Sequence, residues 1–200
     1  MARIVEGEAR AVILAHARDL FLAEGSPNVS MRRIAKAVGV TPMALYRHFD
    51  NKEVLQIELL RDGFRTFDSY LARSERGADA AERLDLLVAG FRDFALEEPA
   101  YFELMFLTGQ TLDGLRDRRE VRKAARPTFR RLVDGVAACM KTGDLEPGNA
   151  EDVALTLLAQ ATGLAALYRS GNLRWSRAEA RRRFDASFAA TLAGFRRGLR

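Results

Sequence analysis

Cysteine, histidine and proline are scarce in this chain, whose 200 residues include one cysteine, two histidines and five prolines. The single cysteine, Cys139, cannot form an intramolecular disulfide, so we expect a reducing, cytoplasmic environment. The two histidines, His16 and His48, fall in different predicted helices, and neither a Cys-x-x-Cys nor a His-x-x-x-His pattern occurs. We therefore predict no metal site and no cofactor.

Long apolar runs and strand patterns are also missing. The first residues, MARIVEGEAR, lack the apolar core of a signal peptide, and no run is expected to reach the length of a membrane span. No window alternates between apolar and polar residues as a strand does, and repeats and low-complexity segments are absent. These absences predict an all-α protein with no membrane partner.

The chain is basic and rich in apolar residues. Hydrophobic residues make up 48% of it, which is enough for a sizeable core, and the net charge is +5. This excess is compatible with a polyanionic partner such as nucleic acid. Arginines also crowd residues 116–131 and 174–183, where we expect a solvated surface.

The segment from Val29 to Lys52, VSMRRIAKAVGVTPMALYRHFDNK, predicts two short helices joined by a tight turn. Ser30 is expected to cap the first helix, Gly39 to end it in a left-handed conformation, and Thr41-Pro42 to start the second. The side chains expected to face inward are Ile34, Ala35, Val38, Val40, Leu45 and Phe49. This layout is that of a helix-turn-helix, about residues 29–48, whose second helix enters a DNA major groove.

Positive charge accompanies this segment. The only acidic residue between Gly25 and Lys52 is Asp50, which we expect to cap the following helix with Glu53 as its reciprocal partner. Arg32 and Lys52 flank the second helix and could contact phosphates on either side of a groove. The alternative for the same residues is a helical hairpin of an all-α core with a solvated basic face.

The stretch SMRRIAKAVGVTPMALYRHFDNKEVL, residues 30–55, resembles the DNA-binding motif of the TetR family of one-component bacterial transcriptional regulators. The matching residues are Ile34, Ala35, Gly39, Val40, Leu45, Tyr46, Phe49, Lys52, Glu53 and Leu55. The resemblance implies contacts with base edges and phosphates, and the predicted DNA-binding set is Ser30, Arg32, Arg33, Thr41, Pro42, Met43, Tyr46, Arg47, His48 and Lys52. The family often has small or basic residues at the start of the recognition helix, where this chain has Pro42-Met43. Apolar contact with a thymine methyl is therefore as plausible at these positions as a hydrogen bond to a base.

Helical patterns continue through the rest of the chain. Further helices are expected over about residues 6–24, 51–74, 79–97, 101–107, 118–141, 149–170 and 176–198, with Pro127 as a kink or boundary and a loop over Thr108–Gly114. We predict a helix-turn-helix domain over residues 1–50 and a helical effector-binding and dimerisation domain over residues 51–200. The helix from Asn51 crosses this boundary without a linker, so it could carry a signal between ligand and DNA.

Large apolar residues are dense from Phe64 onward. Aromatic residues at helical spacing usually belong to a core, but members of the resembled family bind a small molecule in this domain. We therefore predict an apolar cavity for an unidentified small-molecule effector, lined by some of Phe64, Phe67, Phe91, Phe94, Phe102, Met105 and Phe106.

The last two helices are predicted to form a homodimer. Small residues, Ala159, Thr162, Gly163 and Ala166, would let another helix approach, and a stripe of Phe184, Phe188, Leu192, Phe195 and Leu199 follows helical spacing. Ordinary packing within the chain is the alternative. The resemblance favours a two-fold four-helix interface, and a symmetric dimer would read a palindromic DNA operator.

Two other classes of function remain open at this stage. An enzyme would need a catalytic constellation, but Cys139 lies between Ala138 and Met140 like a small core residue, and the adjacent Glu97 and Glu98 do not share a helix face. An all-helical interaction protein without DNA-binding activity is the second. We predict a non-enzymatic regulator, with repression as the usual sense in the family and activation as the alternative.

Overall fold

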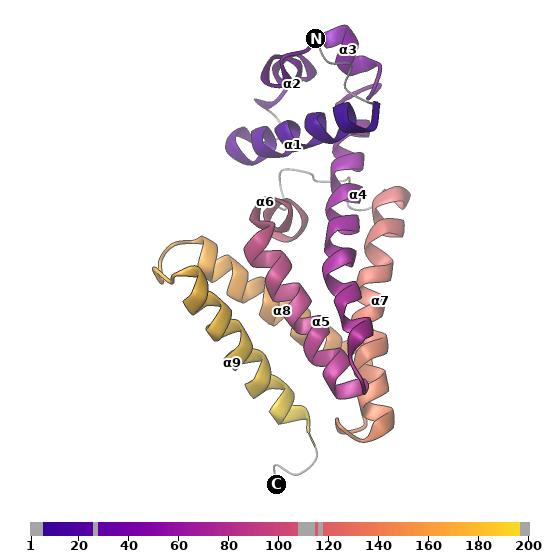
Figure 1. Ribbon diagram of the computed structural model, residues 1–200, viewed down its shortest axis with the longest axis vertical. Coiled ribbons are helices and arrows are strands. Elements are labelled where there is room, and N and C mark those ends of the chain that lie inside the picture. The colour runs from indigo at the N-terminus through magenta and orange to yellow at the C-terminus, as the bar shows by residue number, and fades with distance from the viewer. Residues whose placement is uncertain (1–5, 26–27, 108–114, 116–117, 197–200) are drawn as a thin grey trace. The chain divides into compact units, whose positions relative to one another are not determined.

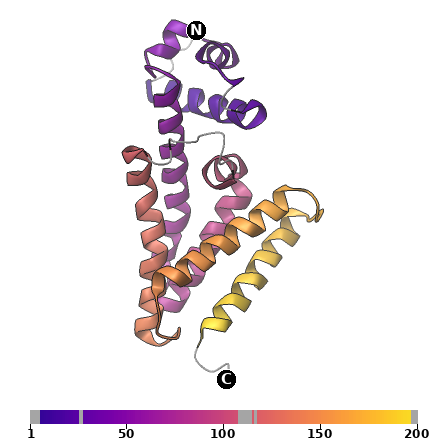
Figure 2. The ribbon, with the colours of Figure 1, turned by 180° about the vertical axis from the view of Figure 1, so that it is seen from behind.

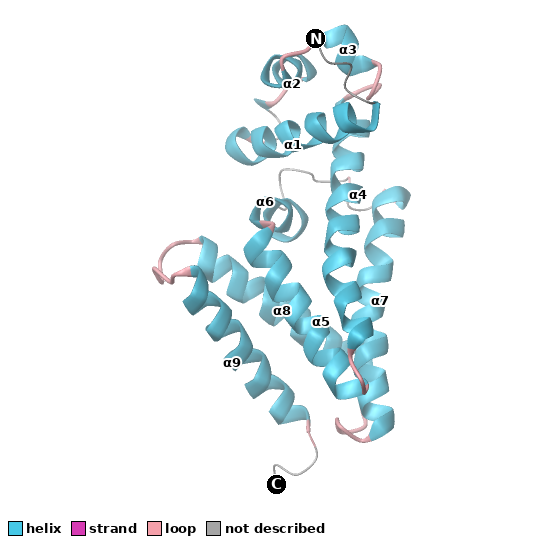
Figure 3. Cartoon of the chain, viewed as in Figure 1, coloured by secondary structure: helices cyan, strands magenta, loops and turns pink. Residues whose placement is uncertain are grey.

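The computed structural model of the protein describes residues 6–25, 28–107, 115 and 118–196. Every regular element within these residues is a helix, as Figure 3 shows, so the predicted all-α fold is confirmed. The chain divides into two compact units, one of Met1–Gly63 with Ala100–Lys123 and the other of Phe64–Pro99 with Ala124–Arg200. Their bounds differ from those of the predicted domains, because the stretch from Ala100 joins the first unit.

The first unit begins with α1 (Glu6–Glu24), α2 (Met31–Val38) and α3 (Pro42–Tyr46), which lie together in Figure 1, and includes the start of α4 (Lys52–Leu71). One apolar stripe of each helix faces a shared core. That core buries Ile13, Leu14, Ala17, Phe21, Ile34, Ala35, Leu45, Phe49 and Leu55. Because Ile34 and Leu45 are fully enclosed, the opposite faces of α2 and α3 are left for solvent or a partner.

The same unit contains α6 (Pro99–Phe102) and a π-helical turn, η3 (Glu103–Leu107), where one short helix was predicted. The hydroxyl of Tyr101 hydrogen-bonds the carboxylate of Asp62 on α4, and the Arg18 guanidinium lies 4.9 Å from the Tyr101 ring centroid. A Cβ on Gly63 would lie 2.6 Å from Sδ of Met105, so a larger residue at this position would require the Met105 side chain to shift. The predicted loop over Thr108–Gly114 lies outside the described residues.

The second unit holds the end of α4, the 3₁₀ turn η2 (Ala72–Arg76), α5 (Ala80–Glu97), most of α7 (Arg119–Thr142), α8 (Ala150–Arg169) and α9 (Arg177–Phe195). Figures 1 and 2 both show α8 and α9 side by side as an antiparallel pair. Helix α7 continues through Pro127, which is therefore not a boundary.

Predicted caps fix several helix starts in this unit. The side chains of Asp79, Asn149 and Ser176 accept hydrogen bonds from main-chain N–H groups in the first turns of α5, α8 and α9. Asp79 accepts from the N–H of Glu82 at 2.8 Å, and the carboxylate of Glu82 accepts from the N–H of Ala78 at 2.7 Å. The expected capping arrangement at α5 is therefore confirmed.

A network of ion pairs joins α9 to α5. Arg92 is buried, and its guanidinium pairs with Asp93 at 2.8 Å and also with Asp185. Arg181 lies 3.0 Å from Asp93 and 3.5 Å from Glu97. Buried guanidinium groups require such partners, because an unpaired charge in the interior is costly. The network therefore sets which face of α9 is turned toward the unit.

Helix α8 corrects one expectation about apolar runs. It is the one helix in the described ranges long and apolar enough, by length and composition, to cross a membrane. A core helix of a soluble protein passes the same test. Only 28% of its apolar window is buried within the chain, so much of this helix presents apolar surface outward.

Candidate DNA-binding surface

The turn between α2 and α3 has the predicted geometry. Ser30 caps α2 by accepting a hydrogen bond from the N–H of Arg33 at 3.2 Å. Gly39 adopts the left-handed conformation, with φ of 78° and ψ of 27°. The N–H of Gly39 then bonds the carbonyl of Lys36, and that of Val40 bonds the carbonyl of Ala35 at 3.0 Å. These two bonds satisfy carbonyls that the end of α2 would leave unpaired.

Helix α3 begins as expected but ends early. Thr41 Oγ1 accepts from the N–H of Ala44 at 3.1 Å, and Pro42 occupies the first helical position. The helix ends at Tyr46, and Arg47 is its C-cap rather than a residue within it. His48, predicted on the same helix, lies in the following turn, where its N–H bonds the carbonyl of Leu45 at 3.0 Å.

The outward side of this motif carries large exposed side chains. Met43 is 70% exposed and Tyr46 is 45% exposed, while Thr41, Pro42 and Arg47 are also exposed. Two apolar or aromatic side chains projecting from a five-residue helix expose area that burial against a partner would remove from water. The surface is therefore available for contact with DNA. His48 is half-buried, so it is less accessible than the exposed residues of this surface.

Val40 was predicted to plug the space between the helices, and this prediction is wrong. Its side chain is 37% exposed, whereas Leu45 and Phe49 fill the interior. Gly39 turns the chain so that the next residue points out, and the buried Ile34 and Ala35 already close the gap. Val40 thus adds to the exposed apolar surface beside α3.

The start of α4 differs from the expected capping pair. Asn51, rather than Asp50, caps the helix, since its Oδ1 accepts from the N–H of Val54 at 2.9 Å. Glu53 instead forms an ion pair of 2.6 Å with Arg118. Lys52 is the first helical residue, and its Nζ lies 6.0 Å from the ring centroid of Phe21. This half-buried cation therefore stands at a helix N-terminus, where main-chain N–H groups also favour an anion.

The two arginines of α2, Arg32 and Arg33, differ in whether an acidic side chain of the same unit binds them. Arg32 and the nearby Lys36 are exposed. The guanidinium of Arg33 donates two hydrogen bonds to the carboxylate of Glu24 on α1, from Nε to Oε2 at 2.6 Å and from Nη2 to Oε1. Hydrogen bonds from Arg33 lower the pKa of Glu24, and the same contact raises the pKa of Arg33. Glu24 therefore competes with any phosphate for the Arg33 side chain.

Arg10 is a residue of this surface that the sequence did not reveal. Its Nη1 donates to the main-chain carbonyl of His48 at 2.8 Å, and its guanidinium carbon lies 4.4 Å from the ring centroid of Phe49. Its Nη2 is 3.4 Å from the carboxylate of Glu58. No local pattern signals this contact, because 38 residues separate Arg10 from His48.

The predicted effector residues fall in both compact units. In the second unit, the Phe67 ring packs on those of Phe91 and Phe94, with centroids 4.9 Å and 4.8 Å apart. In the first, the rings of Phe102 and Phe106 are 4.9 Å apart. Phe102 and Met105 are buried, while Phe64 and Phe106 are half-buried. The structure thus shows aromatic packing within each unit, and the effector cavity stays a prediction.

The predicted dimer residues separate into two groups. Phe184, Phe188 and Leu192 are buried within their own chain, so their assignment to a dimer face is corrected. They face inward because α9 packs its large side chains against α5 and α8. Ala159 and Gly163 are exposed, and Ala166 and Phe195 are half-buried. Leu199 lies outside the described residues.

Known proteins share both the sequence pattern and the fold. The family model for bacterial regulatory proteins of the tetR family matches residues 13–59, and that for the tetracyclin repressor-like C-terminal domain matches residues 84–193. The uncharacterized HTH-type transcriptional regulator YobS of Bacillus subtilis (strain 168) is 30% identical over 103 residues. That match covers 50% of this chain and 53% of YobS, so the chain spans about half the length of this relative.

Two solved structures extend the likeness to nearly the whole chain. A protein of unknown function from Rhodococcus sp. RHA1 superposes with a TM-score of 0.79 at 25% identity, covering 98% of this chain and 99% of that one. The transcriptional regulator FadR of Bacillus subtilis, solved in complex with stearoyl-CoA, has a TM-score of 0.79 at 14% identity, covering 92% and 98%. The C-terminal family model alone spans more than half of the residues. The chain therefore belongs to the TetR family of bacterial transcriptional regulators, which are DNA-binding proteins rather than enzymes.

Proposed function

We propose that this protein is a repressor whose homodimer binds a palindromic operator in the cytoplasm and releases it when a small apolar or aromatic effector binds. The observation that carries the DNA-binding role is the exposure of Met43 and Tyr46 on a short helix, and of Arg47 at its C-cap, with contacts at both ends of the helix. The contacts of Thr41 at its start and Arg10 after its end support a rigid presentation of this surface.

Fluorescence anisotropy with the DNA upstream of the protein's own gene tests this role. We expect tighter binding than to a random duplex of equal length, with affinity falling steeply between about 50 and 200 mM salt, because released counterions drive the binding. Equal affinity for both duplexes, with no dependence on salt, would contradict it. Transcription from the same promoter with and without the protein then separates repression from activation.

The outward face of α8 supports a homodimer. Leu155 is 55% exposed and Leu167 is 49% exposed, and Ala159 and Gly163 lie on the same side. A Cβ on Gly163 would meet no atom of its own chain within 4 Å, so intrachain packing does not require glycine there. A second copy on this face would bury the leucines and use the small residues for close approach. Two recognition helices could then meet successive major grooves about 34 Å apart.

Light scattering at micromolar concentration tests the dimer. Gly163→Arg should yield a monomer that unfolds cooperatively, because a Cβ there meets no atom of its own chain within 4 Å and the longer side chain extends toward the proposed partner. Ala137→Arg, at an exposed position on α7, is the control and should leave the dimer intact. A monomeric wild-type protein would contradict the proposal.

The aromatic residues of the helical units support an apolar effector. Three phenylalanine rings, Phe67, Phe91 and Phe94, meet in the second unit, and rings in a core can rearrange around a ligand of similar character. The FadR structure of related fold contains stearoyl-CoA, an acyl ligand. Release from DNA would follow from a higher affinity of the effector for a conformer with altered spacing of the recognition helices.

A thermal-shift screen with apolar, aromatic and fatty compounds tests the effector class. We expect compounds that raise the melting temperature also to lower operator affinity, because the coupling between two ligands is reciprocal. Stabilising compounds that leave DNA binding unchanged would contradict the release mechanism.

A further inference from the structure

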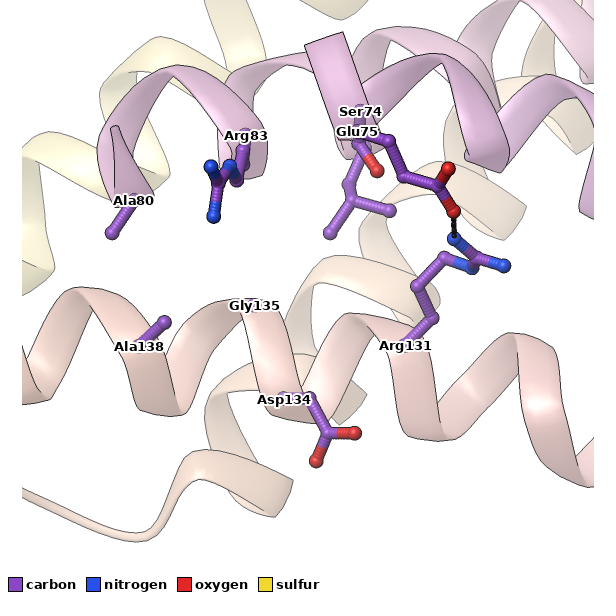
Figure 4. Close-up of a pocket in the computed structure, with 9 residues that line it drawn as sticks. Ser74, Glu75, Ala80, Arg83, Arg131, Asp134, Gly135 and Ala138 are labelled. Carbon is purple, nitrogen blue, oxygen red and sulfur yellow. Dashed lines mark hydrogen bonds and ion pairs between the residues drawn. The ribbon is translucent and has the colours of Figure 1, made fainter. Parts of the chain in front are cut away.

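A cavity of about 400 Å³ lies in the second unit between α7 on one side and η2 with α5 on the other (Figure 4). Its volume falls within the range of small-molecule sites, which is roughly 300–1,000 Å³. None of its lining residues belongs to the predicted aromatic pocket. They are Ser74, Glu75, Ala80, Arg83, Leu87, Arg131, Asp134, Gly135 and Ala138.

Arg83 carries the charge that this cavity offers to a ligand. Its Nε donates to the carbonyl of Gly77 at 2.9 Å, which fixes the direction of the side chain. Figure 4 shows the guanidinium pointing from α5 toward α7. Within the described part of the chain, its two terminal nitrogens have no hydrogen-bond or ion-pair partner. A guanidinium held in this way presents donors suited to a carboxylate.

The other charged groups of the cavity are engaged or turned away. Arg131 pairs with Glu75 at 2.8 Å and with Asp68 at 3.3 Å, and these contacts raise its pKa. Asp134 points away from α5 in Figure 4 and lies 3.7 Å from Arg130. Arg131 thus engages the Glu75 carboxylate, which leaves Arg83 as the lining cation without an ion-pair partner among the described residues.

Apolar and small residues form the remainder of the wall. Leu87 approaches α7 at Gly135, and Figure 4 shows Ala80 on α5 across from Ala138 on α7, so these positions provide almost no side chain. A Cβ on Gly135 would lie 2.7 Å from Cδ1 of Leu87, so Leu87 packs directly against this glycine and closes the wall between α5 and α7 there. A short alkyl chain could lie against Leu87 and Ala138 while its polar end meets Arg83.

We propose that this cavity binds a small amphiphilic carboxylate, with the carboxylate on Arg83 and the alkyl group between Leu87 and Ala138. The site is separate from the aromatic effector cavity proposed above and does not depend on it. The carboxylate would therefore be a second small-molecule ligand of the helical unit that carries the proposed dimer face.

Calorimetric titration of the full-length protein with octanoate tests the proposal. Octanamide and octylamine have the same chain length without the negative charge, and both should bind at least about tenfold more weakly, as expected for loss of a charged hydrogen bond. Arg83→Gln should weaken octanoate to a similar extent and leave octanamide unchanged. Arg126→Gln removes the same charge from an exposed position of α7 outside the lining, and it should retain octanoate binding.

A steric variant provides an independent measurement. Ala138→Phe should fill the cavity and abolish octanoate binding, whereas Ala137→Phe, at the neighbouring exposed position outside the lining, should not. Octanoate binding that survives both Arg83→Gln and Ala138→Phe would overturn the proposal, as would equal affinity for octanamide or no binding at millimolar octanoate. Because this readout uses no DNA, its result is independent of the operator experiment.

Discussion

Arg10 on α1 and His48 after α3 are joined by a hydrogen bond of 2.8 Å from the guanidinium to the main-chain carbonyl. The same guanidinium lies over the ring of Phe49 and beside the carboxylate of Glu58 on α4. Helix α3 has only five residues, too few to keep its position without tertiary contacts. Arg10 thus connects the end of the recognition helix to the two helices that flank it.

Replacing Arg10 with methionine should lower operator affinity by about fivefold to tenfold, the effect of losing one hydrogen bond to a charged donor. Methionine keeps the apolar cover over Phe49, and Glu58 retains its contact with Arg61. Anisotropy across a salt series should show an unchanged slope, because Arg10 is assigned no phosphate. A slope reduced by about one would instead make Arg10 a phosphate contact.

Glu24→Gln should strengthen DNA binding. The substitution removes the carboxylate that holds Arg33, so this arginine becomes available to phosphate and the salt slope should steepen by about one. The lowered pKa of Glu24 means that the ion pair stabilises the fold above the unfolded-state pKa and is lost as pH falls through the folded-state value. Asp19→Gln, at an exposed position of α1, is the control and should change affinity little.

Substitutions of Lys52 and Arg47 should weaken DNA binding in different ways. Lys52→Ala should weaken binding to specific and random duplexes alike and reduce the salt slope by about one, as expected for a phosphate contact. Arg47→Ala should relax the preference for the operator, since its exposed side chain is proposed to reach base edges. Equal losses on both duplexes for Arg47→Ala would remove it from the base-reading set.

Gly90 and Gly163 form a matched pair for stability. A Cβ on Gly90 would lie 2.7 Å from the main-chain oxygen of Tyr70, so Gly90→Ala should lower the free energy of unfolding by about 1–3 kcal/mol. Gly163→Ala meets no atom of its own chain within 4 Å and, at concentrations low enough for the protein to be monomeric, should raise it by up to about 1 kcal/mol through helix propensity. Urea unfolding of both variants provides the comparison, and equal changes would contradict it.

Cys139 should affect stability only in alkali. Burial, with added repulsion from Asp144 and Asp85, raises its pKa from 9.0 to about 11, and its thiol donates to the carbonyl of Ala80. The folded state therefore favours the neutral thiol, and its contribution is complete below about pH 9 and lost as pH rises through about 11. Melting temperatures under reducing conditions should fall less between these values for Cys139→Ala than for wild type. Parallel curves would exclude this role.

Hydrogen bonds between residues three or four positions apart could be predicted from the sequence. Ser30, Thr41 and Asp79 each accept a hydrogen bond from an N–H three residues later, so residue type and spacing sufficed to predict them. Gly39 likewise ends α2 because glycine adopts positive φ without steric cost. The helical fold and the helix-turn-helix layout follow from these local signals together with apolar periodicity, whereas the family came from the resemblance of residues 30–55 to a known motif.

Only the tertiary structure decided which side of each helix meets another. The phenylalanines of α9 satisfy the same periodicity whether they face α5 or a second chain, and only the packed unit shows Phe184 and Phe188 inside. The choice of Asn51 over Asp50 as a cap depends on where the preceding turn places the chain. The hydrogen bond from Arg10 to His48 joins segments that are distant in sequence, and so does the cavity beside Arg83. Such contacts depend on the path of the whole chain and could not be predicted from local patterns.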